Sequence, residues 1–222
     1  MVTKTISSAP TSPHKKYGFF KTKSAEEHCK STAKFYQSRF SHVPALTSEN
    51  LLSDFSCNDV ILVDCRTAPE RKVSMMEGAV SLKEFESSYR QHDGVPDDTK
   101  VILYCTIGYR SGMEAKRLLQ KYSGLQGNIQ SLDGIVSFTH ALEKDTTSPS
   151  WSVVDPITLL PTTKVHCFGP LWACPHEKYT AISYPFPILV VRTMQVGLTL
   201  TVRTLQSVAY NAYHCCRKSK VD

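Results

Sequence analysis

The stretch KVILYCTIGYRSGMEAKRLLQK, residues 100–121, decides how this chain folds. It opens with the apolar run Val101–Tyr104, which is typical of a strand that is covered on both faces. Beyond a short loop, apolar residues recur at helical spacing with charged residues between them. We therefore expect a buried strand, a tight loop and an amphipathic helix, with Ser111 as the helix N-cap. Cys105 stands where the strand ends and the loop begins.

The loop after Cys105 combines several groups that favour a thiolate over a thiol. The backbone N–H groups of residues 106–111 have no helical partners, so a loop that curls around the sulfur gathers them into an anion-binding nest. The helix dipole adds positive potential at the same point, and Arg110 adds a planar fork of donors. Gly108 permits the backbone angle that a tightly closed loop needs. The sequence thus predicts a nucleophilic cysteine with donors placed to hold an anionic substrate.

Strands and helices alternate through residues 40–145, which predicts an α/β fold with a parallel sheet and helices on both faces. In such sheets, ligands bind at the carboxyl ends of strands, where Cys105 would lie. The segment Arg66–Ala79 is expected to be a loop. The other expected strands are Val60–Asp64 and Asn128–Leu132, and the other expected helices are Thr47–Phe55, Leu82–Gln91 and Gly134–Leu142.

Five motifs follow one another in this part of the chain. They are the strand and helix pattern of Val43–Leu52, Val-Asp-x-Arg-x-x-x-Glu at 63–70, Gly-Ala-Val at 78–80, Cys-x-x-x-x-Arg-Ser at 105–111 and Asp-Gly-Ile at 133–135. Together they resemble the rhodanese sulfurtransferases over about residues 40–145. Two departures stand out, because the family's His and Pro before Gly78 are missing and Asp133 replaces the first of its paired glycines. The resemblance implies a rhodanese-like doubly wound parallel sheet, here with N- and C-terminal extensions.

The resemblance also implies an activity, namely the transfer of sulfane sulfur from thiosulfate or a similar donor to a thiophilic acceptor through a persulfide on Cys105. The residues that would bind the small anionic donor are those of the loop: Thr106, Ile107, Gly108, Tyr109, Arg110 and Ser111. The acceptor would be a thiol or a protein, and the reaction needs no metal or organic cofactor. Cys65 is expected to be a buried cysteine, with a second, resolving thiol as the alternative.

Asp64, Arg66 and Glu70 follow the strand that precedes the Cys105 strand in the chain. They can be interpreted as catalytic carboxylates beside a base, or as an ion-pair network that supports the neighbouring loop. The resemblance and their position at a strand end favour structural support.

Two other functions stay open at this stage. Related loops with one more residue between Cys and Arg occur in a group of cell-cycle phosphatases, although the loop of this chain is of the shorter kind. A regulatory or binding module without turnover is the second alternative. The complete loop argues against such a module, whereas the long basic ends of the chain favour some partner.

The charge of this 222-residue chain is formally +6 and is concentrated at its two ends. Residues 1–40 carry eight Lys/Arg and two Glu, and residues 182–222 carry five Lys/Arg and one Asp. The segment between them is mildly acidic, with 13 basic and 17 acidic residues. We therefore predict no nucleic-acid partner for the central domain.

Four parts are expected along the chain. Residues 1–39 form a basic, Ser/Thr-rich extension with one helix at 24–38, where Ser24 and Glu27 make a capping-box pattern. Residues 40–145 form the rhodanese-like domain, residues 146–181 a C-terminal extension and residues 182–222 an apolar and basic tail.

In the extension, His166, Cys167, Cys174 and His176 have no standard metal-site spacing, so packing is expected rather than zinc. Lys164–Phe168 is expected to be a strand.

The tail alternates apolar residues from Val196 to Val202, which also predicts a strand. Arg192 and Arg203 leave only ten residues between them, too few for a membrane span of about 20 residues. Weak contact with a membrane surface or a protein is expected of the tail.

The eight cysteines show no regular framework and no secretory segment opens the chain, which favours a reducing compartment. The expected location is the cytoplasm. The alternative is a mitochondrion or plastid, because residues 1–23 are basic and contain no acid.

Overall fold

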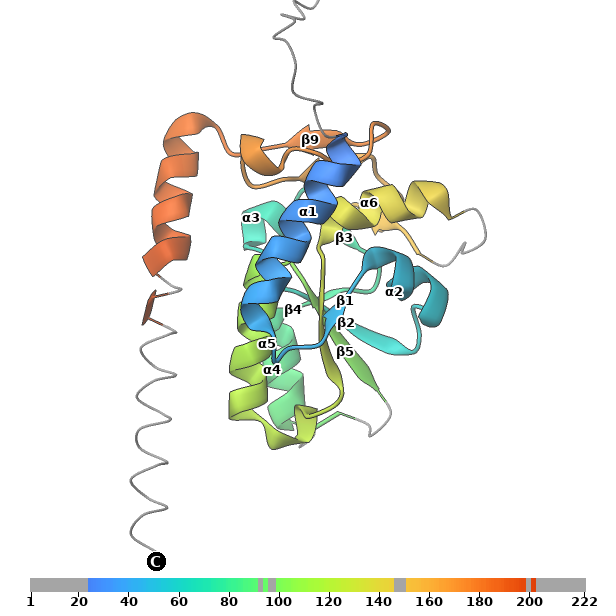
Figure 1. Cartoon of the computed structure of the whole chain (residues 1–222), viewed down its shortest axis with the longest axis vertical. Coiled ribbons are helices and arrows are strands. Elements are labelled where there is room, and N and C mark those ends of the chain that lie inside the picture. The colour runs from blue at the N-terminus through green and yellow to red at the C-terminus, as the bar shows by residue number, and fades with distance from the viewer. Residues whose placement is uncertain (1–23, 92–93, 96–98, 146–150, 199–200, 203–222) are drawn as a thin grey trace, which may run out of the picture.

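The computed structural model describes residues 24–91, 94–95, 99–145, 151–198 and 201–202 (Figure 1). Within them, the centre is a five-stranded sheet in the order β1-β6-β5-β2-β4, and its strand pairs are all parallel. These strands are β1 (Ala45–Leu46), β2 (Val60–Asp64), β4 (Val80–Ser81), β5 (Lys100–Tyr104) and β6 (Ile129–Leu132). The prediction of a parallel α/β sheet is confirmed, and β5, the strand before Cys105, is its central strand.

Helices cover both faces of the sheet (Figure 1). The helices of the domain are α2 (Ser48–Asp54), α4 (Leu82–Gln91), α5 (Tyr109–Lys121) and α6 (Ile135–Lys144). Side chains of β5 point alternately to the two faces, as the pleat requires. Leu103 belongs to the apolar cluster that contains Leu118 of α5, whereas Ile102 belongs to the cluster that contains Phe138 of α6. The strand is therefore buried on both sides, which fixes the position of the residue that follows it.

Helix α1 (Ala25–Gln37) lies N-terminal to the sheet and packs against α5 and α6. Its start has the predicted capping box, since Ser24 Oγ accepts from the Glu27 N–H and the Glu27 carboxylate accepts from the Ser24 N–H. A single 3-10 turn, η1 (Ser38–Phe40), follows it. The N-terminal extension thus contributes an ordered helix to the molecule, as the sequence predicted.

The C-terminal extension packs onto the domain through one short strand, and two further strands pair with each other. Strand β7 (Val153–Val154) pairs antiparallel with β3 (Met75–Met76), and β8 (Lys164–His166) pairs parallel with β9 (Thr180–Ile182). A 3-10 turn, η3 (Pro170–Trp172), lies between β8 and β9 in the chain. The strand predicted at Lys164–Phe168 is confirmed for its first three residues.

Residues 186–198 form a helix beside the domain, drawn in orange in Figure 1. The prediction of a strand at 196–202 is therefore wrong, because 196–198 continue this helix and 201–202 are also helical. A strand needs a neighbour for its backbone groups, and no strand of the described residues pairs with this segment. None of the helices in the described ranges is long and apolar enough to cross a membrane.

Two local predictions are also corrected. Helix α5 begins at Tyr109 with Gly108 as its N-cap, not at Ser111, because Gly108 takes a φ of 89° and ends the loop earlier. The segment Arg66–Ala79, expected to be a loop, contains helix α3 (Ala68–Arg71) and strand β3. A capping box between Thr67 and Glu70 starts that short helix.

Candidate active site

Cys105 directly follows β5 at the carboxyl edge of the sheet and is only 1% exposed. Its carbonyl oxygen accepts a hydrogen bond of 2.9 Å from the Ile135 N–H, and the next carbonyl, of Thr106, accepts one of 3.3 Å from Val136. The first turn of α6 therefore fixes the start of the loop. This is where the sequence placed the nucleophile.

The backbone N–H groups of residues 106–111 donate to no acceptor in the part of the chain that the structure describes. The first N–H after them with a partner belongs to Gly112, which donates to the Gly108 carbonyl oxygen at 3.2 Å. These six donors lie in the loop after Cys105 and in the first turn of α5, where the helix dipole is positive. The geometry suits an anion held at the helix N-terminus beside the sulfur.

Ser111 contributes its side chain to the site as well as its backbone N–H. Its Oγ lies 3.7 Å from Cys105 Sγ and 3.4 Å from the Leu132 carbonyl oxygen, and it accepts a hydrogen bond of 3.1 Å from Ser131 Oγ. All of these groups are buried. The sequence treated Ser111 as a helix cap and missed this hydroxyl, although its place six residues after the cysteine puts it on the first turn below the sulfur.

Arg110 forms an ion pair with Glu70. Its Nη1 and Nη2 donate to the two carboxylate oxygens at 2.7 Å each, and Nη2 also donates to Thr106 Oγ1 at 3.0 Å. Burial tends to raise the pKa of Glu70, but the Arg110 guanidinium outweighs burial and holds that pKa at about 2. The fork donors of Arg110 thus contact Glu70 in this structure, and Arg110 also lines the cavity next to Cys105.

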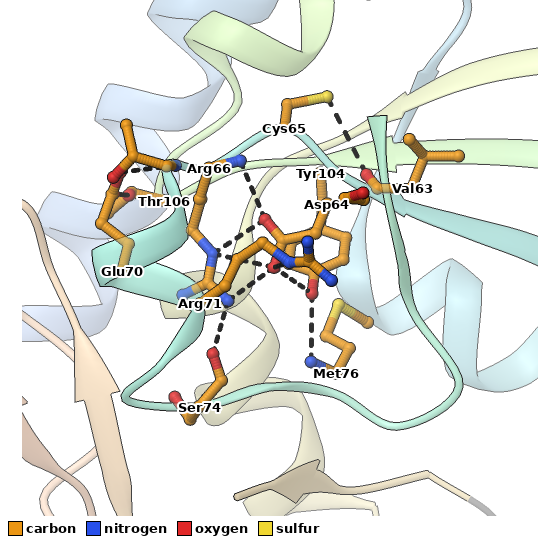
Figure 2. A network of polar contacts seen from close by, with 12 residues as sticks. Val63, Asp64, Cys65, Arg66, Glu70, Arg71, Ser74, Met76, Tyr104 and Thr106 are labelled. Carbon is orange, nitrogen blue, oxygen red and sulfur yellow. Dashed lines mark hydrogen bonds and ion pairs between the residues drawn. The ribbon is translucent and has the colours of Figure 1, made fainter. Parts of the chain in front are cut away.

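Asp64 and Arg66 form a second buried network, shown in Figure 2. Arg66 Nη2 donates to Asp64 Oδ2 at 2.7 Å and to the Ser74 carbonyl oxygen at 2.6 Å. Tyr104 Oη donates to the same Asp64 oxygen at 2.7 Å and accepts from the Met76 N–H at 3.1 Å. The network ties the ends of β2 and β5 to the segment that leads into β3.

The three residues expected to form one supporting network thus belong to two. Asp64 and Arg66 hold the 66–76 segment, while Glu70 holds Arg110 and Thr106 of the Cys105 loop. Both arrangements are ion pairs with almost no solvent exposure, and neither places a carboxylate in the cavity next to Cys105. Structural support of the loop therefore stays the interpretation that these contacts favour.

Cys105 opens into a cavity of about 420 Å³, called here the Cys105 pocket. Ile107, Tyr109 and Arg110 of the loop form one side of it. The rest of its lining comes from segments outside the domain: Phe35, Tyr36 and Arg39 near the end of α1, Phe168 and Trp172 of the C-terminal extension, and Val196 of the 186–198 helix. The sequence did not identify these residues as part of a site, because nothing in their spacing links them to a loop so distant in the chain.

Cys65 does not line the Cys105 pocket. It lies at the end of β2 beside a different cavity of about 780 Å³, and its Sγ approaches the Val63 carbonyl oxygen at 3.9 Å. Burial raises the pKa of this thiol well above its usual value.

Within the described ranges, no three His, Cys, Asp or Glu side chains are grouped so that they could hold a metal ion.

Comparison with known proteins gives one family match, in which residues 47–137 fit the model of the rhodanese-like domain. Among solved structures, a thiosulfate sulfurtransferase from Pseudomonas aeruginosa is similar at 20% identity and a TM-score of 0.38, over 52% of this chain and 22% of its own. A rhodanese-related protein from Thermoplasma volcanium is similar at 19% identity and a TM-score of 0.36, over 50% of this chain and 98% of its own. No curated protein matches the chain.

Proposed function

We propose that this chain, whose residues 47–137 form a rhodanese-like domain, is a sulfurtransferase that carries sulfane sulfur on Cys105. One observation above all supports the proposal. A buried cysteine at the end of the central strand opens into a cavity and is followed by six N–H groups that donate to no acceptor in the described chain. Such a site suits an anionic sulfur compound bound next to a thiolate nucleophile.

The proposed reaction has two steps. The Cys105 thiolate attacks the outer sulfur of a donor such as thiosulfate, a new S–S bond forms on the enzyme, and sulfite leaves with the electron pair of the broken bond. A thiophilic acceptor then attacks the outer sulfur of the persulfide, and Cys105 leaves again as the thiolate. The atoms and charges balance in both steps without an added oxidant or cofactor.

Both steps place negative charge on sulfur, and hydrogen-bond donors surround the position of that charge. The N–H groups of residues 106–111 stabilise the negative persulfide, which is the form that must wait for the acceptor. The Ser111 hydroxyl, 3.7 Å from Sγ, adds one more donor on the buried side of the sulfur. Glu70 and Arg110 hold the loop in the shape that aims these donors.

The test compares the wild type with Cys105→Ser and Cys65→Ser, where the second variant controls for the loss of a cysteine at the end of a neighbouring strand. Each protein is treated with thiosulfate, and its intact mass and its rate of thiocyanate formation from cyanide are measured. We expect the wild type and Cys65→Ser to gain one sulfur atom and to turn over, and Cys105→Ser to do neither.

Equal turnover by Cys105→Ser would refute the proposal. So would Cys105-dependent hydrolysis of an aryl phosphate without any sulfur transfer, because that result would assign the loop to phosphatase chemistry.

A cytoplasmic or other reducing location belongs to the same proposal, since the persulfide has to be discharged by thiols and the six cysteines of the described residues are all free.

A further inference from the structure

A chain of hydrogen bonds runs from the C-terminal extension to the network that holds the Cys105 loop. Tyr184 Oη lies 2.9 Å from Thr67 Oγ1, and Thr67 Oγ1 donates to Glu70 Oε2 at 2.7 Å. A hydroxyl group has one hydrogen, so Thr67 accepts from Tyr184 while it donates to Glu70. The chain ends on the carboxylate that accepts from Arg110 and Thr106. Tyr184 therefore adds a donor at the far end of the contacts that fix the loop.

Phe168 of the same extension contacts Arg110 directly. Arg110 Cζ lies 5.4 Å from the centre of the Phe168 ring, so the guanidinium that pairs with Glu70 also has an aromatic partner. The Phe168 backbone has a φ of 62°, a strained conformation for a residue with a Cβ. It is held there because its N–H donates to His166 Nδ1 at 3.0 Å and its carbonyl oxygen accepts from the Tyr184 N–H at 3.2 Å. Such strain persists only where the surrounding structure fixes it, and it is typical of functional sites.

Both side chains come from outside residues 47–137, the segment that fits the family model, and both are buried. We propose that Tyr184 and Phe168 are positioning residues of the candidate active site. Through Glu70 and Arg110, the C-terminal extension holds the Cys105 loop in the shape that aims its N–H groups. This inference rests on the proposed function and adds two residues to the same site. Because a displacement of about 1 Å in a site lowers a rate by roughly a hundredfold, contacts remote from the sulfur affect its chemistry.

The first experiment tests whether Tyr184 acts through the Thr67 hydroxyl, by measuring kcat/KM for thiosulfate on the full-length chain with cyanide as the acceptor. Tyr184→Phe removes one hydroxyl and keeps the ring, and we expect kcat/KM to fall about tenfold, as for one hydrogen bond in a chain that ends on a charge. In Thr67→Ser, which keeps the hydroxyl, Tyr184→Phe should have the same effect. In Thr67→Val, which keeps the shape without the hydroxyl, it should have none.

The second experiment needs no turnover. Cys105 is alkylated with iodoacetate or with iodoacetamide, which form the same C–S bond with loss of iodide but differ in charge, and the modified residue is located by peptide mass. Correctly aimed N–H donors favour the anionic reagent, so the ratio of the iodoacetate rate to the iodoacetamide rate measures their placement. Tyr184→Phe and Phe168→Leu should lower this ratio severalfold, whereas looser packing alone would raise both rates together.

Tyr179→Phe is the matched control in both experiments. It removes the hydroxyl of a half-buried tyrosine in the same extension, outside the Cys105 pocket. We expect its kcat/KM and its ratio of alkylation rates to equal those of the wild type.

The outcomes separate this inference from the proposed function. If the wild type forms no persulfide on Cys105, the proposed function fails, and the ratio of alkylation rates still decides on positioning. An unchanged ratio in Tyr184→Phe or in Phe168→Leu overturns the inference for that residue while the sulfurtransferase stands. An effect of Tyr184→Phe on kcat/KM that persists in Thr67→Val also overturns it, because the hydroxyl would then act by another route.

Discussion

Glu70 shows at the scale of one residue how this site depends on charge pairing. The side chain is completely buried, yet it stays ionised because it accepts from both Nη atoms of Arg110 and from the hydroxyl groups of Thr67 and Thr106. Removing one partner of such a pair leaves the other buried and unpaired, which costs several kcal/mol. The carboxylate therefore matters for stability as well as for the shape of the Cys105 loop.

The lowered pKa of Glu70 predicts how stability depends on pH. The pKa of Glu70 is about 2 in the folded chain, and its ordinary value, taken for the unfolded chain, is 4.5. The stabilisation is therefore present above pH 4.5 and is lost as the pH falls toward 2. Glu70→Gln has no carboxylate and therefore no such pH-dependent stabilisation. The difference in unfolding free energy between the wild type and this variant should shrink by about 3 kcal/mol between pH 4.5 and pH 2. Chemical denaturation at a series of pH values measures it.

A second ion-paired carboxylate, outside the Cys105 pocket, provides the control for this variant. Glu86 also has a pKa lowered to about 2, since Arg117 and Lys121 outweigh its partial burial, but it lies away from the Cys105 pocket. Glu86→Gln should leave the rate of sulfur transfer unchanged, whereas Glu70→Gln should reduce it. Equal rates for the two variants, or a pH-independent gap for Glu70→Gln, would contradict the role given to Glu70.

At the scale of elements, the turn between β6 and α6 sets the position of the Cys105 loop. Asp133, at the end of β6, accepts from Ser48 Oγ of α2 at 2.5 Å, and burial raises the pKa of this carboxyl to about 7 despite that hydrogen bond. Gly134 follows with a φ of 111°. A Cβ there would meet the Thr106 carbonyl oxygen at 2.5 Å and the Ile107 nitrogen at 2.6 Å, so backbone packs directly on backbone.

This contact predicts that Gly134→Ala displaces the Cys105 loop. Gly78→Ala is the matched control, because Gly78 also has a positive φ, of 73°, but has no atom within 4 Å of an added Cβ. Both variants should lose about 1 kcal/mol or more to backbone strain, and only Gly134→Ala should in addition lose most of its sulfur-transfer rate. Thermal unfolding and kcat/KM measured on both proteins check this, and equal activity of the two would count against the close approach.

At the scale of the whole molecule, the 186–198 helix has two different sides. Arg192 and Val196 are partly buried and line cavities of the domain, while Phe186, Val191, Met194 and Leu198 are among its exposed apolar side chains. Residues 182–222 carry five Lys/Arg and one Asp. Exposed apolar side chains and excess positive charge are the combination by which a helix binds an anionic membrane surface.

We therefore expect the full-length chain to sediment with vesicles that contain phosphatidylserine, to do so much less with pure phosphatidylcholine, and to be released by salt. Val191→Glu together with Met194→Glu, at positions 53% and 69% exposed, should abolish the binding. The paired control is Ile157→Glu, an exposed apolar residue of the C-terminal extension that should have no effect. Binding that ignores lipid charge, or that survives the double substitution, would assign this surface to another partner.

Much of the site followed from local sequence. The apolar run before Cys105 predicted a doubly covered strand, Gly108 predicted the tight loop, and the alternation of elements predicted a parallel sheet. The observed strand β5 and the parallel strand pairs agree with these predictions. Local patterns also located α1, down to its capping box. These predictions succeed because strand periodicity, caps and positive-φ glycines depend on neighbours in the chain.

Local sequence did not reveal the contacts between residues that are distant in the chain. The alternation at 196–202 predicted a strand, but residues 196–198 and 201–202 are helical. Arg110 was expected to hold the substrate, which stays a prediction, and only the fold shows that both of its Nη atoms donate to Glu70, 40 residues earlier.

The sequence alone determined the proposed nucleophile, its place at the end of a buried strand and the N–H groups that follow it, because one continuous stretch contains them all. Only the tertiary structure decided what surrounds that sulfur. Phe35, Tyr36, Phe168 and Trp172 reach the pocket from both extensions through side-chain packing, which no spacing within a single segment encodes. The physical reason is that strand periodicity, helix caps and positive-φ glycines depend on neighbours in the chain, whereas the walls of a pocket are set by the distant surfaces that bury apolar area together.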